Sequence, residues 1–272
     1  MEEVPLAGGN MTAGVVRSGD TVRRPVSPQS ATVHRLLAHV RAQGVEWVPR
    51  VHGIDDEGRE VLDFIEGEVL HGNPEWMWEP EVLDGVVRSL RQFHDATATF
   101  ERGPEDVWFW PGKEPAEVIC HVDFAPYNHV FRDRRLVGVI DFDLCYPAPR
   151  LWDLAWTVYR YGPLTPPRES DVADGDGADR SPFDVAAMRD RARQALATYG
   201  AYVGADDEAE RVRTVAELLG WTVHRLDAIA AWGEGNGSPE HRAWARMYRA
   251  HARWIEAGGL GEIQHVEVRD LT

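Results

Sequence analysis

Lysine is almost missing from this chain: among its 272 residues, Lys113 is the single lysine, and the other basic side chains are arginines. Cysteine is equally scarce, because only Cys120 and Cys145 are present. Two cysteines do not make a disulfide framework, so buried, reduced thiols are expected. No apolar run reaches the roughly 18 residues that a membrane-spanning helix needs, which argues against a membrane protein.

Positive charge is in short supply as well. Lysine and arginine total 29 against 45 aspartates and glutamates, which gives a formal net charge of −16. Nucleic-acid binding depends on basic side chains that neutralise phosphates, so this balance argues against a nucleic-acid partner. An acidic surface could attract a cationic substrate, although such surfaces are common and need no special explanation. The N-terminus lacks the apolar core of a signal peptide, and with reduced thiols this favours a cytoplasmic location.

Hydrophobic residues make up 43% of the chain and aromatic residues 10%, which is typical of a folded globular protein of one or two lobes. The most informative stretch is residues 119–143, ICHVDFAPYNHVFRDRRLVGVIDFD. Residues 118–120 and the pair 129–131 and 136–140 read as short strands. A hairpin of the last two would bring Asn128 and Asp141 to the same end, with Asp123 in the loop before it.

Two carboxylates and a carboxamide at one edge of a hairpin have a defined chemistry. Their oxygens suit Mg²⁺, and a carboxylate left off the metal can accept a proton from a hydroxyl. Phosphoryl transfer from a nucleoside triphosphate needs both a hard cation and such a base. The alternative is a polar hairpin whose carboxylates come together by chance.

The spacing His121-x-Asp123-x4-Asn128, followed by Asp141-Phe142-Asp143, resembles the catalytic core of the aminoglycoside phosphotransferase and choline kinase group. These enzymes are small-molecule relatives of protein kinases. The resemblance implies that Asp123 orients or deprotonates the acceptor hydroxyl. It also implies that Asn128 and Asp141 hold Mg²⁺ on the phosphates of ATP, and that His121 supports the loop.

The resemblance further implies a two-lobed, protein-kinase-like α+β fold. Residues 1–66 would form a small β-rich nucleotide-binding lobe, and residues 67–272 a mainly helical lobe with the catalytic loop and the acceptor site. Helical spacing predicts helices over residues 30–44, 185–199, 208–231 and 239–256. Strands are expected over residues 47–51 and 60–65. The acidic stretch 164–182 is either a lid over a cationic acceptor or a plain solvated loop.

The N-terminal part departs from the family pattern. Members usually place a lysine on the third strand, paired with a glutamate on the next helix, whereas this region has no lysine and its helix has no glutamate. Arginine grips phosphate bidentately but does not replace lysine freely. We expect Arg23, rather than Arg24, to contact phosphate; alternatively both simply solvate an edge strand. The Gly8-Gly9-Asn10 turn is either a phosphate-cradling loop or an ordinary one.

Residues 62–67 resemble the family's hinge, where backbone groups bond the adenine edge. The candidates here are Phe64, Ile65 and Glu66. The function implied is ATP-dependent, Mg²⁺-dependent phosphorylation of a hydroxyl on a small molecule such as an antibiotic or an alcohol. The missing Lys–Glu pair motivates one alternative, a catalytically weak binding or immunity protein on the same fold. Another alternative is a kinase that phosphorylates peptide serine or threonine.

Overall fold

A computed structural model describes residues 2–6, 14–70, 72–168, 180–200, 208–236, 238–267 and 269–270. The Gly8-Gly9-Asn10 turn and residues 169–179 of the acidic stretch lie outside these ranges. The chain forms two compact units. The first contains residues 1–74, 91–149 and 270–272, and the second contains residues 75–90 and 150–269. The boundary that we expect at residue 66 falls inside the first unit, so the division into lobes there stays a prediction.

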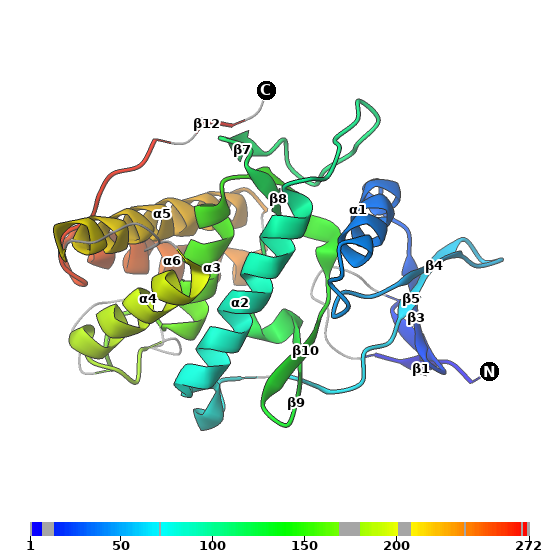
Figure 1. Cartoon of the computed structure of the whole chain (residues 1–272), viewed down its shortest axis with the longest axis horizontal. Coiled ribbons are helices and arrows are strands. Elements are labelled where there is room, and N and C mark those ends of the chain that lie inside the picture. The colour runs from blue at the N-terminus through cyan, green and yellow to red at the C-terminus, as the bar shows by residue number, and fades with distance from the viewer. Residues whose placement is uncertain are drawn as a thin grey trace. The chain divides into compact units, whose positions relative to one another are not determined.

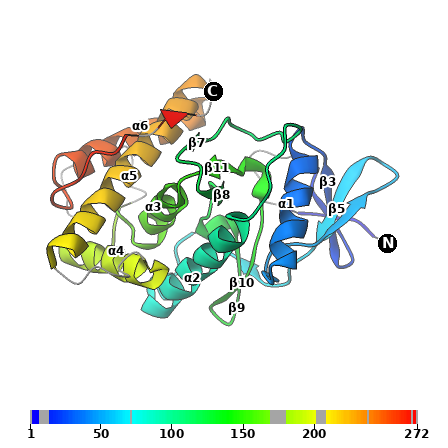
Figure 2. The same cartoon turned by 45° about the horizontal axis from the view of Figure 1, so that its top comes forward.

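An antiparallel sheet of five strands begins the first unit (Figure 2). Its strand order is β1-β2-β3-β5-β4, with consecutive neighbours antiparallel. The strands are β1 (Val4–Pro5), β2 (Val16–Ser18), β3 (Thr21–Pro25), β4 (Val51–Ile54) and β5 (Arg59–Asp63). Helix α1 (Ser30–Ala42) runs beside this sheet, and its apolar positions Val33, Leu36, Leu37 and Val40 are buried. The helix predicted over residues 30–44 is thereby confirmed in its main part.

The strand expected over residues 47–51 is wrong, because β4 begins only at Val51. The preceding segment is held by a side chain and by a backbone bond to β10 (Arg135–Val139), in which the Val139 nitrogen donates to the Trp47 carbonyl oxygen at 3.2 Å. Arg41 Nη1 donates to the carbonyl oxygens of Glu46, at 2.9 Å, and Val48, at 2.7 Å. Pro49 has no backbone N–H to offer a neighbouring strand. This segment therefore leads into β4 as a loop.

Short strands carry the predicted catalytic stretch, also in the first unit. Strand β8 (Val118–Cys120) pairs with β11 (Tyr146–Ala148), and β9 (His129–Arg132) pairs with β10 (Arg135–Val139) and with β6 (Glu68–Val69). The 3₁₀ turns η2 (Pro126–Asn128) and η3 (Phe142–Leu144) follow the loop and the hairpin. Strand β7 (Lys113–Glu114) and the two-residue β12 (Arg269–Asp270) complete the set. The hairpin predicted over residues 129–140 is confirmed.

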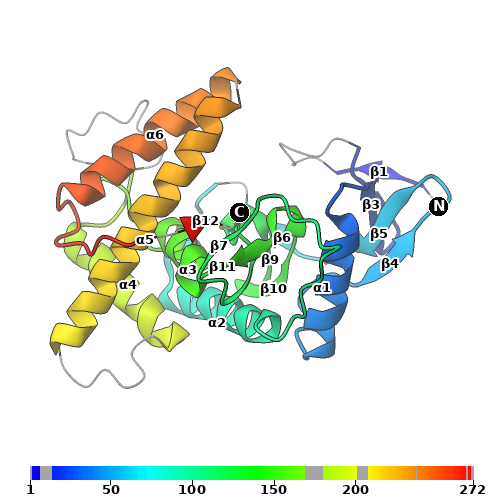
Figure 3. The same ribbon diagram turned by 90° about the horizontal axis from the view of Figure 1, so that it is seen from above.

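Helices make up most of the second unit. They are η1 (Glu75–Trp78), α2 (Pro80–Thr97), whose last turns belong to the first unit, α3 (Arg150–Tyr161), α4 (Val185–Tyr199), α5 (Glu208–Gly235) and α6 (Pro239–Glu256). Helices α5 and α6 lie side by side (Figures 1 and 3). The predicted helices at 185–199 and 239–256 are confirmed, and α5 runs four residues beyond the expected end. Within the described ranges, no helix combines the length and apolarity needed to cross a bilayer.

Candidate active site

The loop between β8 and β9 holds the predicted base. Asn128 Nδ2 donates to Asp123 Oδ2 and to the Asp123 carbonyl oxygen, each at 3.0 Å. The hydroxyl of Tyr127 lies 2.6 Å from the other carboxylate oxygen, Oδ1. The structure therefore brings Asp123 and Asn128 together, as expected, and both oxygens of the base have a partner.

His121 ties this loop to the hairpin. Its Nδ1 lies 3.3 Å from the backbone nitrogen of Asp123, and its Nε2 lies 3.0 Å from the carbonyl oxygen of Ile140. A backbone N–H can only donate, so Nδ1 accepts and the neutral ring carries its proton on Nε2. The ring is fully buried and packs against Phe142, with centroids 4.6 Å apart. One side chain thus fixes the backbone next to both predicted catalytic aspartates.

Hairpin register decides where Asp141 lies. Val139 pairs with His129, and the backbone nitrogen of Ile140 donates to the carbonyl oxygen of Asn128 at 2.9 Å. Asp141 follows directly, in the left-handed region at φ 65°, and its side chain is 48% exposed.

The backbone of Val122, next to the predicted base, has φ 73°, which is strained for a β-branched residue. Such strain persists only where the surroundings impose it, and it gathers at functional sites.

Arg24 on β3 links three carboxylates. Its Nε lies 2.7 Å from Glu60 Oε1, its Nη2 lies 2.5 Å from Asp143 Oδ1, and its Nη1 lies 3.6 Å from Asp141 Oδ1. Glu60 is directly opposite Arg24 in the β3–β5 register and is 1% exposed. Its second oxygen lies 2.6 Å from His34 Nε2 on α1. The guanidinium thus joins the N-terminal sheet to the Asp141–Asp143 turn.

Arg23 lies on the other face of the same strand. Its Nη1 is 3.5 Å from Glu3 and 3.8 Å from Asp55, and these contacts differ from those of Arg24 because side chains alternate along a strand. The structure does not bring Arg23 to the carboxylates of the hairpin. Arg24 lies there instead, and the phosphate contact expected of Arg23 stays a prediction.

Negative charge exceeds positive charge around Asp141. Although part of the Asp141 side chain reaches solvent, the protein around its carboxyl group raises its pKa to about 6, first by desolvation and then by the charge of Asp143, while Arg24 opposes the shift. The pKa of Asp143 is also raised, first by burial, again against the effect of Arg24. For Arg24 itself, burial would lower the pKa, yet Asp143, Glu60 and Asp141 together raise it. A divalent cation beside Asp141 would relieve this repulsion, so the donor set fits Mg²⁺.

The predicted hinge has part of its backbone already engaged. The Phe64 nitrogen donates to the Asp20 carbonyl oxygen at 2.9 Å, and the Glu66 carbonyl oxygen accepts from Arg132 Nη2 at 2.7 Å. The guanidinium of Arg17 lies 3.7 Å from the Phe64 ring centroid and also pairs with the Glu66 carboxylate. These contacts tie Phe64 and Glu66 to arginine side chains of β2 and β9.

Glycine keeps the hinge close to the hairpin. A Cβ on Gly138 of β10 would lie 2.6 Å from Ile65 Cγ2, a separation that real side chains do not adopt. Ile65 therefore packs on the hairpin only because position 138 has no side chain. The hinge and the Asp141 turn are thereby connected through direct packing in the first unit.

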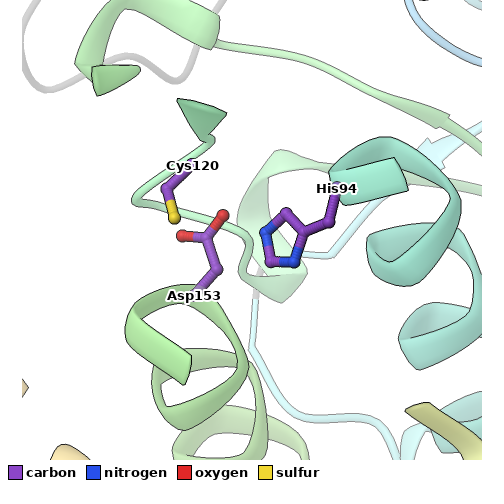
Figure 4. A group of neighbouring side chains, drawn as sticks. All are labelled: His94, Cys120 and Asp153. Atoms are coloured by element: carbon purple, nitrogen blue, oxygen red, sulfur yellow. The ribbon is translucent and has the colours of Figure 1, made fainter. Parts of the chain in front are cut away.

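The fully buried titratable side chains include His94 on α2, Cys120 on β8 and Asp153 on α3 (Figure 4). The first two belong to the first unit and the third to the second. The Cys120 thiol lies 3.4 Å from the carbonyl oxygen of Pro149, so it has a hydrogen-bond partner inside the protein core. Cys145 is likewise a buried free thiol. Both cysteines therefore fit the expectation of packed, reduced side chains.

Comparison with known proteins decides the family. The model of the phosphotransferase enzyme family matches residues 101–190, which include the whole of the 121–143 stretch. Over 266 residues the chain is 33% identical to the trifolitoxin immunity protein of Rhizobium leguminosarum bv. trifolii, covering 93% of this chain and 95% of that protein. The chain belongs to the phosphotransferase enzyme family.

Solved structures of kinases share the fold of this phosphotransferase family member. Choline kinase from Cryptosporidium parvum Iowa II matches with a TM-score of 0.60 at 11% identity, over 94% of this chain and 90% of that chain. Amicoumacin kinase in complex with AMP-PNP and Ca²⁺ matches with a TM-score of 0.55 at 10% identity, over 93% of this chain and 88% of that chain. The protein-kinase-like α+β fold predicted from the sequence is confirmed.

In this family member, the sequence offers Arg24 only as the alternative to Arg23, and it does not indicate Glu60 as the partner of either arginine. The family pattern places this glutamate on the helix after β3, but α1 offers His34 here, and Glu60 comes from β5. A signal existed in the sequence, because the turn at 55–58 predicts a strand that can lie beside β3. The strand register needed to align Glu60 with Arg24 was not available without the structure.

Proposed function

We propose that this phosphotransferase family member transfers the γ-phosphoryl group of ATP to a hydroxyl of a small molecule, with Mg²⁺ as the cofactor. The proposal rests on the arrangement of Asp123, Asn128 and Asp141 at one end of the β9–β10 hairpin. Further support comes from Arg24, which lies against the two carboxylates of the Asp141–Asp143 turn. The family and the fold agree with this reaction class.

Asp123 is the base in this proposal. An acceptor hydroxyl would take the place of the Tyr127 hydroxyl at Oδ1, because Oδ2 is held by the Asn128 amide. Oriented in this way, the hydroxyl oxygen attacks the γ-phosphorus while its proton moves to the carboxylate. The buried His121 keeps the loop in register, so little reorganisation is needed during the transfer.

Asn128 and Asp141 would hold the cation. The Asn128 amide nitrogen is spent on Asp123, so its oxygen is the ligand atom, and Asp141 contributes a carboxylate with an exposed face. Bound Mg²⁺ supplies charge neutralisation on the triphosphate. Asp143 is tied to Arg24 and would act mainly by keeping that guanidinium in position.

Arg24 replaces Arg23 as our proposed phosphate contact. Its guanidinium is fixed by Glu60 on one side and Asp143 on the other, as the family's lysine is fixed by its glutamate. Among the hinge residues, Phe64 and Glu66 each have a backbone group bonded elsewhere, so we assign the adenine edge to Ile65. Use of ATP and the reduced thiols both fit a cytoplasmic protein.

A second candidate function is immunity by binding without efficient catalysis. The observation in its favour is the extended similarity to a protein named for immunity to trifolitoxin. The ion pairs of Arg24 add to it, because an arginine engaged with Glu60 and Asp143 must share its donors with any phosphate. The two functions differ in whether the nucleotide is consumed.

Nucleotide binding and consumption together test the proposal. We expect ATP with Mg²⁺ to raise the melting temperature, and Asp141→Ala to remove that shift. We also expect ADP release to increase with an acceptor from a panel of aminoglycosides, macrolides, choline-like alcohols and peptides. Binding without ADP release from any acceptor would favour the immunity protein, and a peptide acceptor would favour the peptide kinase. No response to nucleotide would contradict a kinase.

A further inference from the structure

The hydroxyl of Tyr127 lies next to the carboxylate of Asp123, the predicted base. Its Oη lies 2.6 Å from Asp123 Oδ1, within the range in which a general base takes a proton from its substrate. The Tyr127 residue is 39% exposed, so the phenol lies at the surface of the loop. A hydroxyl in this relation to the base has the geometry of an acceptor.

The remaining contacts of Asp123 make this relation specific. The Asn128 amide donates to Oδ2 and to the backbone carbonyl, whereas the Tyr127 hydroxyl donates to Oδ1. Tyr127 belongs to the same 3₁₀ turn as Asn128, and Pro126 stiffens the start of that turn. The phenol is therefore carried by the segment that also carries a proposed metal ligand, and the Asn128 carbonyl oxygen accepts at 2.9 Å from the backbone nitrogen of Ile140, next to Asp141.

We propose that Tyr127 is itself a phosphoryl acceptor, and that the chain phosphorylates this hydroxyl in cis when no other acceptor is bound. This inference rests on the proposed phosphotransferase function. Tyr127 Oη attacks the γ-phosphorus of ATP, and a new P–O bond forms. The bond from the γ-phosphorus to the β,γ-bridging oxygen breaks, its electron pair leaves with ADP, and the phenolic proton passes to Asp123 Oδ1.

The product limits the reaction to one event per chain. A phosphotyrosine carries about −1.5 to −2 charges and would lie beside Asp123, in a site where Asp141 and Asp143 already repel one another. Like-charge repulsion then weakens rebinding of the anionic nucleotide. The modified chain is a resting form, and an external acceptor that displaces the phenol from Oδ1 prevents its formation.

Intact-mass spectrometry after incubation with ATP and Mg²⁺ measures the event directly, and peptide mapping locates it among the seven tyrosines. We expect at most one phosphoryl group per chain, on Tyr127, with a rate constant that does not change with protein concentration. Tyr127→Phe should abolish it, and Asp123→Asn should slow it about 10²- to 10⁴-fold. Tyr248→Phe, on α6 of the second unit, is the matched control and should leave it unchanged.

Parallel readouts separate this inference from the proposed function. Melting-temperature shifts with ATP and Mg²⁺ report nucleotide binding, and they also show whether Tyr127→Phe is folded. Binding and ADP release without phosphate on Tyr127 would overturn the inference and leave the phosphotransferase standing. Faster ATP hydrolysis in Tyr127→Phe, with unmodified wild-type protein, would mean that the phenol only shields the base, which also overturns it. Absence of nucleotide binding overturns both.

Discussion

Glu60 lies directly across the β3–β5 ladder from Arg24, with 2.7 Å between Oε1 and Nε, and it is almost completely buried. The ion pair therefore forms inside the N-terminal sheet and not between a strand and a helix. Removal of one partner from such a pair leaves a charge buried without compensation. Single substitutions of these residues should therefore change the stability of the protein by an amount that can be measured.

Substitution of Arg24 should destabilise the protein more than substitution of Arg23. Arg24→Gln leaves Glu60 and Asp143 without their cation, so we expect the free energy of unfolding to fall by roughly 3–5 kcal/mol. Arg23→Gln, on the opposite face of β3, removes half-exposed ion pairs and should cost under about 1 kcal/mol. Urea denaturation gives both values, and equal losses would argue against the assigned role of Arg24.

The base can be tested without disturbing its loop. Asp123→Asn keeps the shape of the side chain but removes its ability to accept a proton. We expect the ATP-induced rise in melting temperature to persist while turnover falls about 10²- to 10⁴-fold. Steady-state ADP release with an identified acceptor measures this. Unchanged turnover in a correctly folded variant would exclude Asp123 as the base.

In the absence of ligand, ionisation of Asp141 should lower the free energy of unfolding as pH rises. Its native pKa, about 6, exceeds the ordinary value of 3.8, so the native state holds this proton more tightly than the unfolded state does. The free energy of unfolding then decreases as pH rises from about 4 to about 6 and stays lower above that range. Asp141→Asn should therefore raise the melting temperature near neutral pH, with a smaller difference near pH 4, and should weaken Mg²⁺ binding.

Asp133 provides the matched control for this pH profile. It is an exposed carboxylate in the β9–β10 turn with φ 49°, a conformation that asparagine also tolerates. Asp133→Asn should leave both the melting temperature and its pH dependence close to those of the wild type. A stabilising effect of equal size in both variants would point to net charge and not to the site.

The approach of Ile65 to Gly138 predicts a defect in the hinge. Gly138→Ala puts a methyl group in contact with Ile65, so we expect a loss of about 1–3 kcal/mol and weaker ATP binding. Gly85→Ala, in helix α2, meets nothing within 4 Å and should stabilise by roughly 0.5–1 kcal/mol. Calorimetric titration with ATP and Mg²⁺ compares the two variants. Undiminished affinity in Gly138→Ala would separate Ile65 from the adenine site.

Arg191 should be a structural residue of the second unit. Its guanidinium is buried and donates to the Tyr161 carbonyl oxygen, at 3.2 and 3.0 Å, and to the Trp78 carbonyl oxygen, at 2.8 Å. Arg191→Leu leaves these carbonyl groups without that donor, so we expect a loss of about 1–3 kcal/mol. Arg193→Leu, more exposed on the same helix, should change stability by less than about 1 kcal/mol. Chemical denaturation distinguishes the two.

Local patterns in the sequence predicted much of this protein. The apolar spacing of α1 and the hairpin around Arg132–Arg135 depend on neighbouring residues alone, and both are confirmed. Selection between Arg23 and Arg24 depends on which face of β3 points to the hairpin, and that is set by contacts far along the chain. The segment before β4 is held by the guanidinium of Arg41 and by the backbone nitrogen of Val139, and no periodicity in the sequence reveals these contacts.

The chain has a valine at position 122, where the backbone conformation would suit glycine. Glycine at φ 73° removes the steric penalty but enlarges the unfolded ensemble and gives the loop more freedom. The backbone amide of Asp123, now held by His121, would then exchange its hydrogen with solvent more readily. The strained valine therefore makes the loop more rigid, and this rigidity should be measurable as slow hydrogen exchange of the Asp123 backbone amide.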